Sequence, residues 1–323
     1  NAGGHGFYRV AYDDTLRSRL AGDALATLDT LERYNLVDDA WNAVVAGRMS
    51  TLEFIEFVEG FANERELAVW QAIVVALHSA GRLVDGDAYT RFQARVNALV
   101  TPAVADLGEP SAADDDLVRK LRGLLTSTLA VLGDDAATQA RCRELFATSI
   151  AHPDAVDPEL TAAATSVVAA TGDADDYQRM LDGMRTAATP QDSLRYLYAL
   201  AEFPDEELLL RTCELAMTDE VKTQNAPFLL RLCIANRLHG GAAWSFVHRN
   251  WELANSRFPT NTIVRMIESV KLLNRPSEVA DVQGFFSEHP IPQAAKTLEQ
   301  TLERQRVNAD LRARDEAELD ASL

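Results

Sequence analysis

Apolar residues recur at spacings of three and four along most of the chain, which is the pattern of helices that bury one face. Five series of this kind each predict a helix: Leu16, Leu20, Leu28 and Leu31; Leu36, Ala40 and Val44; Leu67, Trp70, Val74 and Leu77; Tyr89, Phe92, Val96 and Leu99; Leu117, Leu121, Leu124, Thr128 and Leu132. Similar patterns continue to the end of the chain, so helices are expected throughout.

Start and stop signals divide these helices. Ser50 with Glu53 and Asn63 with Glu66 have the spacing of capping boxes, which open helices. Stops are expected at the glycines and prolines that follow the apolar series: Gly47, Gly81, Pro102, Gly108, Pro110 and Gly133. Residues 108–116 are expected to form a loop. A long last helix is expected from about Pro292 to near Leu319, with a charged end that frays.

Short helices joined by tight turns, without a strict repeat, are typical of stacked helix pairs. We therefore expect an all-α fold, an irregular right-handed α-superhelix of antiparallel helix pairs. A short β-strand over residues 7–12 precedes the helices. A single strand needs a partner, so residues 1–12 are expected to end an upstream β-domain or to connect to it, and residues 13–323 to form the superhelix domain.

Composition narrows the classes of function. The 323 residues are 47% hydrophobic and carry a net charge of −18, which disfavours nucleic acids and anionic membrane surfaces as partners. No apolar run is long enough for a membrane span. The three cysteines, Cys142, Cys213 and Cys233, have neither disulfide nor zinc-knuckle spacing, which favours buried thiols in a reducing, cytoplasmic location.

Catalytic motifs are not found in this sequence. None of the six histidines lies in an H-E-x-x-H segment, and there is no P-loop, dinucleotide fingerprint or G-x-S-x-G segment. His248 and Glu252 are four residues apart, which is metal-ligand spacing on a helix, but no third ligand falls nearby and an exposed helical pair is the simpler interpretation. We therefore predict no catalytic residue and no metal ligand in this chain.

A pair of tryptophans marks the most distinctive stretch. After Gly240 and Gly241, Trp244 and Trp251 lie seven residues apart on one helical face, and Phe285 and Phe286 follow later. Large aromatic residues at helical spacing usually pack in a core, so both tryptophans are expected to be structural.

The same stretch resembles the C-terminal helical domain of the aminopeptidase N family of zinc metallopeptidases, which includes the endoplasmic-reticulum and puromycin-sensitive enzymes. Further short motifs in the order and spacing of that family extend the resemblance from Asn1 to about Asn308: residues 6–13, Glu32-Arg33, Asp38-Asp39-Ala40, Ala46-Gly47, Asn63-Glu64 and Val69-Trp70.

The resemblance implies a HEAT-like array within a larger enzyme that removes N-terminal residues from peptides. In that family the zinc ligands and the catalytic glutamate lie in an upstream domain, and none of those motifs can be assigned to this sequence. The resemblance implies that this part caps the active site and controls peptide access. Its partners would be the upstream catalytic and β-domains and peptide substrates, and zinc would be the cofactor of the parent enzyme only. The chain begins at Asn1, so we expect it to be a piece of a longer polypeptide.

One departure limits what is carried over. Endoplasmic-reticulum members of the family bind a peptide C-terminus with a Tyr-Lys pair and a later Arg. The corresponding positions here are Ala80-Gly81 and Glu202, which cannot form a charge-assisted pair with a carboxylate. Carboxylate binding of that kind is not expected.

The candidate substrate-lining residues are four polar side chains around one predicted helix: Gln224, Asn225, Arg231 and Asn236. The other face of that helix is expected to carry Phe228, Leu229, Leu232 and Cys233. Amide side chains can bond a peptide backbone without reading its sequence, and an arginine can attract a carboxylate. The alternative is that these residues simply face solvent, as on most amphipathic helices.

Two other functions stay open at this point. A stand-alone α-solenoid that binds a partner protein would have the same helical pattern, but it would need a polar capping repeat rather than an unpaired strand at residues 7–12. A complete helical hydrolase would need a cluster of His, Cys and carboxylate residues, which the sequence does not show. An H-E-x-x-H segment upstream of Asn1 would decide between them.

Overall fold

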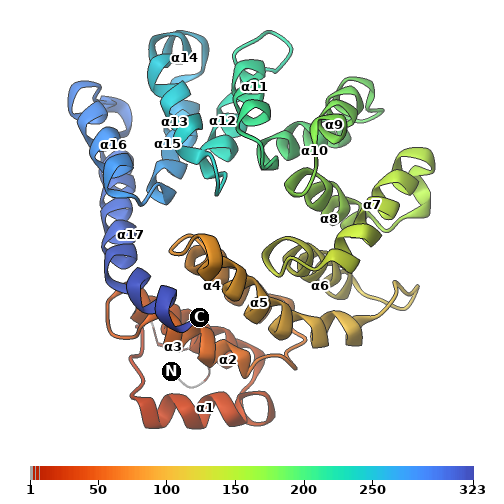
Figure 1. Ribbon diagram of the computed structural model, residues 1–323, viewed down its shortest axis with the longest axis vertical. Coiled ribbons are helices and arrows are strands. Elements are labelled where there is room, and N and C mark those ends of the chain that lie inside the picture. Colours follow the sequence, from red (N-terminus) through yellow and green to blue (C-terminus); the bar gives the residue numbers. More distant parts are fainter. Residues whose placement is uncertain (1–2, 4, 7) are drawn as a thin grey trace. The chain divides into compact units, whose positions relative to one another are not determined.

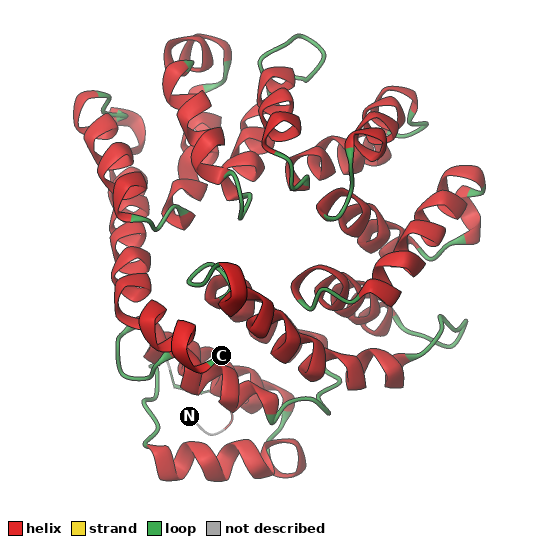
Figure 2. Cartoon of the chain, in the orientation of Figure 1, coloured by secondary structure: helices red, strands yellow, loops and turns green. Residues whose placement is uncertain are grey.

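The computed structural model describes residues 3, 5, 6 and 8–323, without the side chains of residues 14 and 21–25. Within these residues the chain forms seventeen α-helices joined by turns and short 3-10 or π segments, and it contains no strand (Figures 1 and 2). The predicted all-α fold class is confirmed. No helix in the described residues is long and apolar enough to cross a membrane.

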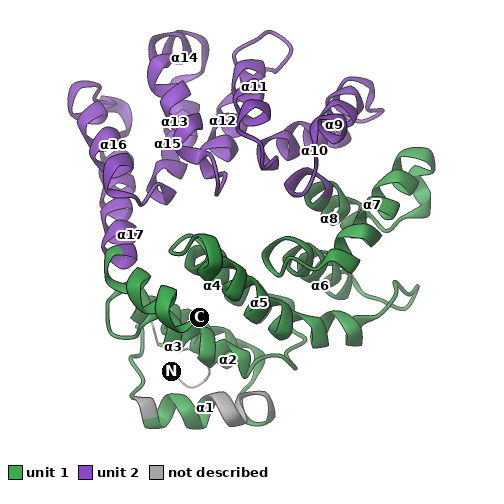
Figure 3. Cartoon of the chain, in the orientation of Figure 1, with its two compact units in different colours: residues 1–167, 313–323 green, residues 168–312 purple. Residues whose placement is uncertain are grey.

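The helices fall into two compact units (Figure 3). Unit 1 comprises residues 1–167 and 313–323, and unit 2 comprises residues 168–312. The predicted boundary between residues 1–12 and 13–323 concerns a longer polypeptide and stays a prediction.

Most of unit 1 is built from eight helices: α1 (Asp14–Thr27), α2 (Thr30–Val45), α3 (Thr51–Glu59), α4 (Leu67–Ala80), α5 (Gly86–Leu107), α6 (Asp116–Ser127), α7 (Ala136–Ala151) and α8 (Pro158–Ala170), whose last residues belong to unit 2. Unit 2 continues with eight more: α9 (Ala174–Thr186), α10 (Pro190–Ala199), α11 (Glu206–Ala216), α12 (Ala226–Ala235), α13 (Gly240–Arg249), α14 (Trp251–Arg257), α15 (Thr260–Ile267) and α16 (Pro276–Glu288). The last helix, α17 (Ala295–Ser322), contributes to both units.

The strand predicted over residues 7–12 is not formed. Residues 8–12 are irregular, and Phe7 lies outside the described residues. A strand is held by hydrogen bonds to a neighbouring strand, and the described residues contain none. The prediction is therefore wrong for residues 8–12 of this chain.

The first apolar series was also misassigned. Helix α1 ends at Thr27, Leu28 lies in the following turn, and Leu16 and Leu31 are 47% and 49% exposed. The next series is confirmed, since Leu36, Ala40 and Val44 are all buried in α2. Spacing alone therefore did not separate an exposed terminal helix from a core helix.

A buried glutamate organises the start of α4. Glu64 is 1% exposed, and its carboxylate accepts two hydrogen bonds from Arg33, from Nε at 2.6 Å and from Nη2 at 3.1 Å. The same carboxylate accepts bonds from the backbone N–H groups of Arg65 and Glu66, and the Glu64 carbonyl accepts the Trp70 indole N–H. These bonds satisfy the entry to α4 in place of the capping box predicted from Asn63 and Glu66, which does not form. The hydrogen bond to Glu64 also raises the pKa of Arg33.

The capping box predicted at α3 is confirmed. The Ser50 hydroxyl accepts a bond from the Glu53 backbone N–H at 3.2 Å, and the Glu53 carboxylate accepts one from the Ser50 backbone N–H at 2.7 Å. Each side chain satisfies an N–H group that has no partner within the helix.

Helix α5 does not stop at Pro102 but runs through it to Leu107. Proline removes one backbone hydrogen bond, and the residues around it, Leu99, Val100 and Ala103, are buried, so packing holds this part of the helix. The stop expected at Gly108 is confirmed, because Gly108 has φ +54°, a conformation that favours glycine.

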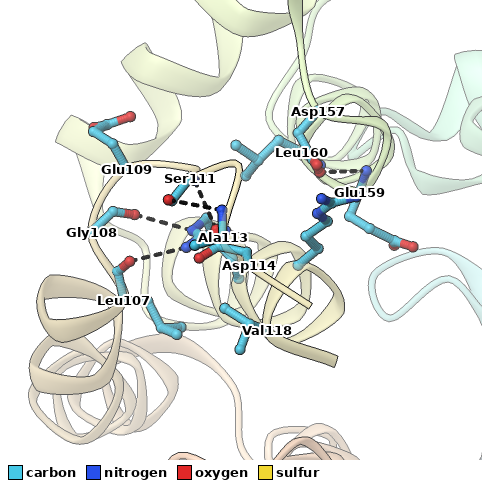
Figure 4. A network of polar contacts seen from close by, with 12 residues as sticks. Leu107, Gly108, Glu109, Ser111, Ala113, Asp114, Val118, Asp157, Glu159 and Leu160 are labelled. Atoms are coloured by element: carbon cyan, nitrogen blue, oxygen red, sulfur yellow. Dashed lines mark hydrogen bonds and ion pairs between the residues drawn. The ribbon is translucent and has the colours of Figure 1, made fainter. Parts of the chain in front are cut away.

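The loop after α5 is held by one buried arginine. Figure 4 labels the loop residues that it joins, Leu107, Gly108 and Asp114. Arg122 of α6 is 5% exposed and donates from Nε to the Gly108 carbonyl and from Nη2 to the Leu107 carbonyl, both at 3.1 Å. Its Nη1 lies 2.8 Å from the Asp114 carboxylate. A hydrogen bond from the Ser111 backbone N–H, helped by Arg122, lowers the pKa of Asp114. The side chain therefore caps the end of α5 and fixes the expected loop.

Helix pairs repeat in unit 2. Helices α9, α11 and α14 each pack against the helix that follows them, and the three followers form a row in which α12 contacts both α10 and α15. We call this the α10–α12–α15 row. Polar bonds tie the pairs together at buried points, as where the Tyr177 hydroxyl of α9 meets the Thr212 hydroxyl of α11 at 3.0 Å.

The two tryptophans form an aromatic cluster with α16. Trp244 and Trp251 are 1% and 5% exposed, and both pack edge-on against Phe285. The Trp244 indole N–H donates to the Asp281 carboxylate at 2.6 Å, so its one polar atom is satisfied. The predicted structural role of both residues is confirmed by this burial.

The last helix is not frayed at its charged end. Within unit 1, Asp315 is 2% exposed and accepts bonds from both the backbone N–H and the hydroxyl of Thr51. Leu319 is also buried. Within unit 2, the amides of Gln305 and Asn308 donate to the carbonyls that follow α15. Charge content alone did not reveal these contacts.

We predict that Trp244→Ala lowers the free energy of unfolding by roughly 3–5 kcal/mol, because it empties a buried indole volume and removes a bonded donor. Chemical denaturation of the 323-residue chain, followed by circular dichroism, measures this change. Leu253→Ala is the matched control, since Leu253 is 50% exposed in the adjacent helix and its loss should cost less than about 1 kcal/mol. Equal effects of the two substitutions would contradict the assigned core role.

Candidate functional site

The four predicted substrate-lining residues all lie in unit 2, at or next to α12. Gln224 and Asn225 belong to the turn before the helix, Arg231 is in its middle, and Asn236 follows its last residue. At about 1.5 Å of rise per residue, the ends of this set are separated by more than about 15 Å. The four residues are therefore spread along the length of one helix and do not line a single pocket.

The turn residues differ in what their side chains can do. Gln224 is exposed. Asn225 precedes the first helical residue, but its side chain makes no capping bond. Its backbone carbonyl accepts bonds from the N–H groups of Phe228 and Leu229, so its main chain is already used.

Arg231 is on the exposed side of α12. Its side chain is 41% exposed, and its guanidinium Nη1 lies 3.9 Å from the Glu268 carboxylate. Glu268 comes after α15, 37 residues further along the chain, and sequence spacing gave no indication of this pair.

Asn236 is occupied by structural bonds. Its side-chain N–H group donates to the carbonyls of Ala201 and Phe203, at 3.0 and 3.1 Å. Its side-chain oxygen accepts the backbone N–H groups of Leu238 and His239. The amide thus joins the end of α12 to the chain before α11, and it leaves little capacity for a ligand.

The apolar face of α12 differs from the one predicted. The buried residues are Ala226, Pro227, Leu229, Leu230, Cys233 and Ile234. Leu232 is 37% exposed and Phe228 is half-buried, so both lie on the same side as Arg231. The exposed side of α12 therefore combines a guanidinium group with apolar surface.

No metal-binding group of three or more His, Cys, Asp or Glu side chains occurs among the described residues. The ion-pair partner of His248 is Asp281, with Nδ1 and Oδ1 3.5 Å apart, so the pairing with Glu252 considered from the sequence is not what holds this side chain.

The cysteines are free and buried. Burial raises the pKa of the Cys142 thiol to about 11 and holds that of the Cys233 thiol well above its ordinary value. A thiol acts as a nucleophile only as the thiolate, so neither of these two is activated.

The cavities lined by described residues of unit 1 include two larger ones. One of about 360 Å³ is bounded by α4, α6 and α8 and includes Gln71, Lys120 and Glu159 among its lining residues. The other, of about 200 Å³, adjoins Arg122 and Arg141. Neither is lined by any of the four predicted residues, which belong to unit 2.

The positions compared with the carboxylate-binding pair of the endoplasmic-reticulum enzymes are closely packed. Ala80 is 1% exposed, and a Cβ atom at Gly81 would lie 2.9 Å from the Phe92 ring. A lysine at residue 81 would require the ring to move, because contacts this short are not found for real Cβ atoms.

The fold defines a domain of stacked helix pairs, in which the exposed side of α12 is the candidate surface. The family model described as the ERAP1-like C-terminal domain matches residues 1–307, and the chain therefore belongs to that family. The resemblance to the C-terminal helical domain of the aminopeptidase N family is thereby confirmed.

Curated relatives agree with this assignment. Aminopeptidase M1-A of Oryza sativa subsp. japonica is 25% identical over 315 residues, which cover 94% of this chain and 36% of that protein. Aminopeptidase M1 of Arabidopsis thaliana is 25% identical over 317 residues, with the same coverage of both chains. A puromycin-sensitive aminopeptidase of Caenorhabditis elegans is 25% identical over 252 residues, covering 76% of this chain and 26% of its own. The chain spans about a third of the length of the first of these relatives, in their C-terminal part.

We predict that Asn236→Ala lowers the free energy of unfolding by roughly 1–3 kcal/mol, because two carbonyl groups lose their donor. Chemical denaturation of the chain measures the change, with Gln224→Ala as an exposed control that should leave stability unaltered. Unchanged stability of the Asn236 variant, together with a changed affinity for peptides in the parent enzyme, would return Asn236 to the substrate-lining set.

Proposed function

We propose that this chain is the C-terminal domain of a zinc aminopeptidase, where it covers the active site and controls the access of peptides. The observation that carries the proposal is the family match over residues 1–307, together with relatives about three times as long that are named aminopeptidases. In this reading the parent enzyme removes N-terminal residues from peptides, and catalysis belongs to the domains that precede this one.

The side chains of this chain that could bind a metal are consistent with catalysis by another domain of the parent enzyme. Zinc sites take three or four His, Cys or carboxylate ligands. The described residues contain no such group, so they do not fit a zinc ion, and we assign zinc to the preceding part of the parent enzyme. The chain's proposed contribution is to bind and orient peptides away from the reacting bond.

The exposed side of α12 is the proposed peptide-facing surface. Gln224 and Asn225 offer amide groups that can bond an extended peptide backbone, and Arg231 offers a positive charge. Asn236 contributes by holding the backbone at the end of α12 in place, and its side chain does not bind the peptide. The apolar neighbours Phe228 and Leu232 would add non-specific contact with peptide side chains.

A cytoplasmic location is part of the proposal. It rests on three unpaired cysteines, which persist as thiols in reducing compartments. The alternative of a stand-alone binding module has weaker support, because the relatives that match nearly the whole chain are aminopeptidases.

We predict that the 323-residue chain alone binds no zinc tightly and does not hydrolyse aminoacyl reporter substrates, whereas the full-length parent enzyme does both. Elemental analysis and a fluorogenic assay measure the two properties. Stoichiometric zinc in the isolated chain, or turnover that persists through an independent purification, would disprove the assignment of catalysis to another domain.

We also predict that Gln224→Ala combined with Arg231→Ala in the parent enzyme raises KM for peptides of several residues that contain no acidic side chain. KM for single-residue reporters should be nearly unchanged, because they are too short to contact α12. Steady-state kinetics on both substrate classes tests this. Equal effects on both classes, or on neither, would assign these residues to the solvent-exposed surface.

A further inference from the structure

Each helix of the α10–α12–α15 row carries an arginine at the same position. Arg195, Arg231 and Arg265 are the sixth residues of α10, α12 and α15. Helix α12 contacts both of the other helices. The three side chains are 25%, 41% and 59% exposed, so solvent reaches each of them.

The three arginines differ in how their charge is balanced. Arg195 has a carboxylate of its own, since its Nη1 donates to Asp192 at 2.9 Å within α10. Arg231 and Arg265 share one carboxylate, that of Glu268: Nη1 of Arg231 lies 3.9 Å from it, and Nη1 of Arg265 donates to it at 2.5 Å. Two positive charges therefore face a single negative charge.

The geometry leaves these two guanidinium groups open to a second acceptor. The side chains of Arg231 and Arg265 are 41% and 59% exposed, whereas Glu268 is only 17% exposed. At 3.9 Å, the pair between Arg231 and Glu268 is too long for a direct hydrogen bond. Each guanidinium group has five N–H donors, and most of them remain available.

The surroundings increase the effect of this local charge. The chain as a whole carries −18, so a net positive site on it is distinct from its background. Phe228 and Leu232 lie beside Arg231 on the exposed side of α12. Apolar neighbours lower the effective dielectric and strengthen the attraction between a guanidinium group and a carboxylate.

We propose that Arg231 and Arg265 bind the carboxylate of an Asp or Glu side chain in the distal part of a peptide substrate. The inference rests on the proposed function, because it assumes that peptides reach the α10–α12–α15 row. In the absence of substrate, the Glu268 carboxylate neutralises one of the two positive charges. An acidic residue of the peptide supplies the second carboxylate that the two arginines lack.

The test uses the full-length parent enzyme and pairs of peptides of about ten residues, which span up to about 33 Å when extended. The two peptides of a pair differ only by Glu or Gln at one position, and that position is moved along the distal half. We expect the Glu peptide to have a kcat/KM about threefold to tenfold higher at one or two neighbouring positions, the range of a partly exposed charge pair. Arg231→Gln and Arg265→Gln should each reduce this ratio, and added salt should reduce it too.

Glu268→Gln is expected to change the ratio of kcat/KM for the Glu and Gln peptides in the opposite direction from the two arginine substitutions. It removes the internal competitor while retaining the shape of the side chain, so the preference for the Glu peptide should increase. A merely structural role of the two arginines predicts no increase. Arg249→Gln is the control for a change of the same charge, because Arg249 is exposed at the end of α13 and should leave the ratio unaltered.

Two outcomes overturn the inference while the proposed function stands. One is that kcat/KM still depends on peptide length but does not differ between the Glu and Gln peptides of a pair. The other is that a higher kcat/KM depends on the free C-terminal carboxylate. Peptides with an amidated C-terminus would then lose the increase whether they carry Glu or Gln. If kcat/KM depends on neither peptide length nor Arg231, the proposed function itself fails.

Discussion

The Glu64 carboxylate has to be bonded from several sides at once, because an ionised group that is 1% exposed is very unfavourable without partners. Arg33 supplies the opposite charge from α2, and the backbone at the start of α4 supplies further donors. The Trp70 indole donates to the carbonyl of the same residue. One residue thus sets where α4 begins, how α2 lies against it, and which way the Trp70 indole points. Replacement of Arg33 would leave the buried Glu64 carboxylate without an opposite charge.

Much of the fold could be predicted from local patterns, and the misses have physical causes. The Ser50–Glu53 cap and the Leu36 series depend on residues close in sequence, so spacing was sufficient for them. Residues 8–12, the entry to α4 and the passage of α5 through Pro102 are decided by distant partners or by packing. The exposure of Leu16 likewise depends on what lies beside α1, which its own sequence does not specify.

The surface around α12 was harder to predict than the fold. The polar residues were found because they are polar, but their environments came from other helices. Asn236 is bonded to backbone carbonyls more than thirty residues earlier, and Arg231 lies near a glutamate that follows α15. The assignment of Leu232 to the buried face failed because a helix with apolar residues on two sides does not show which side packs. The register of the three arginines was visible in the sequence only once the helix boundaries were known.

The division of α17 has a consequence for biosynthesis. Asp315 and Leu319 are buried in unit 1, and Asp315 bonds to Thr51, which is 264 residues earlier. A chain emerging from the ribosome exposes the residues of α2–α8 long before those two are made. Unit 2 is translated in between, so Thr51 has no Asp315 partner until α17 has been made. Of the two units, the one whose synthesis begins first is therefore the last to complete its core.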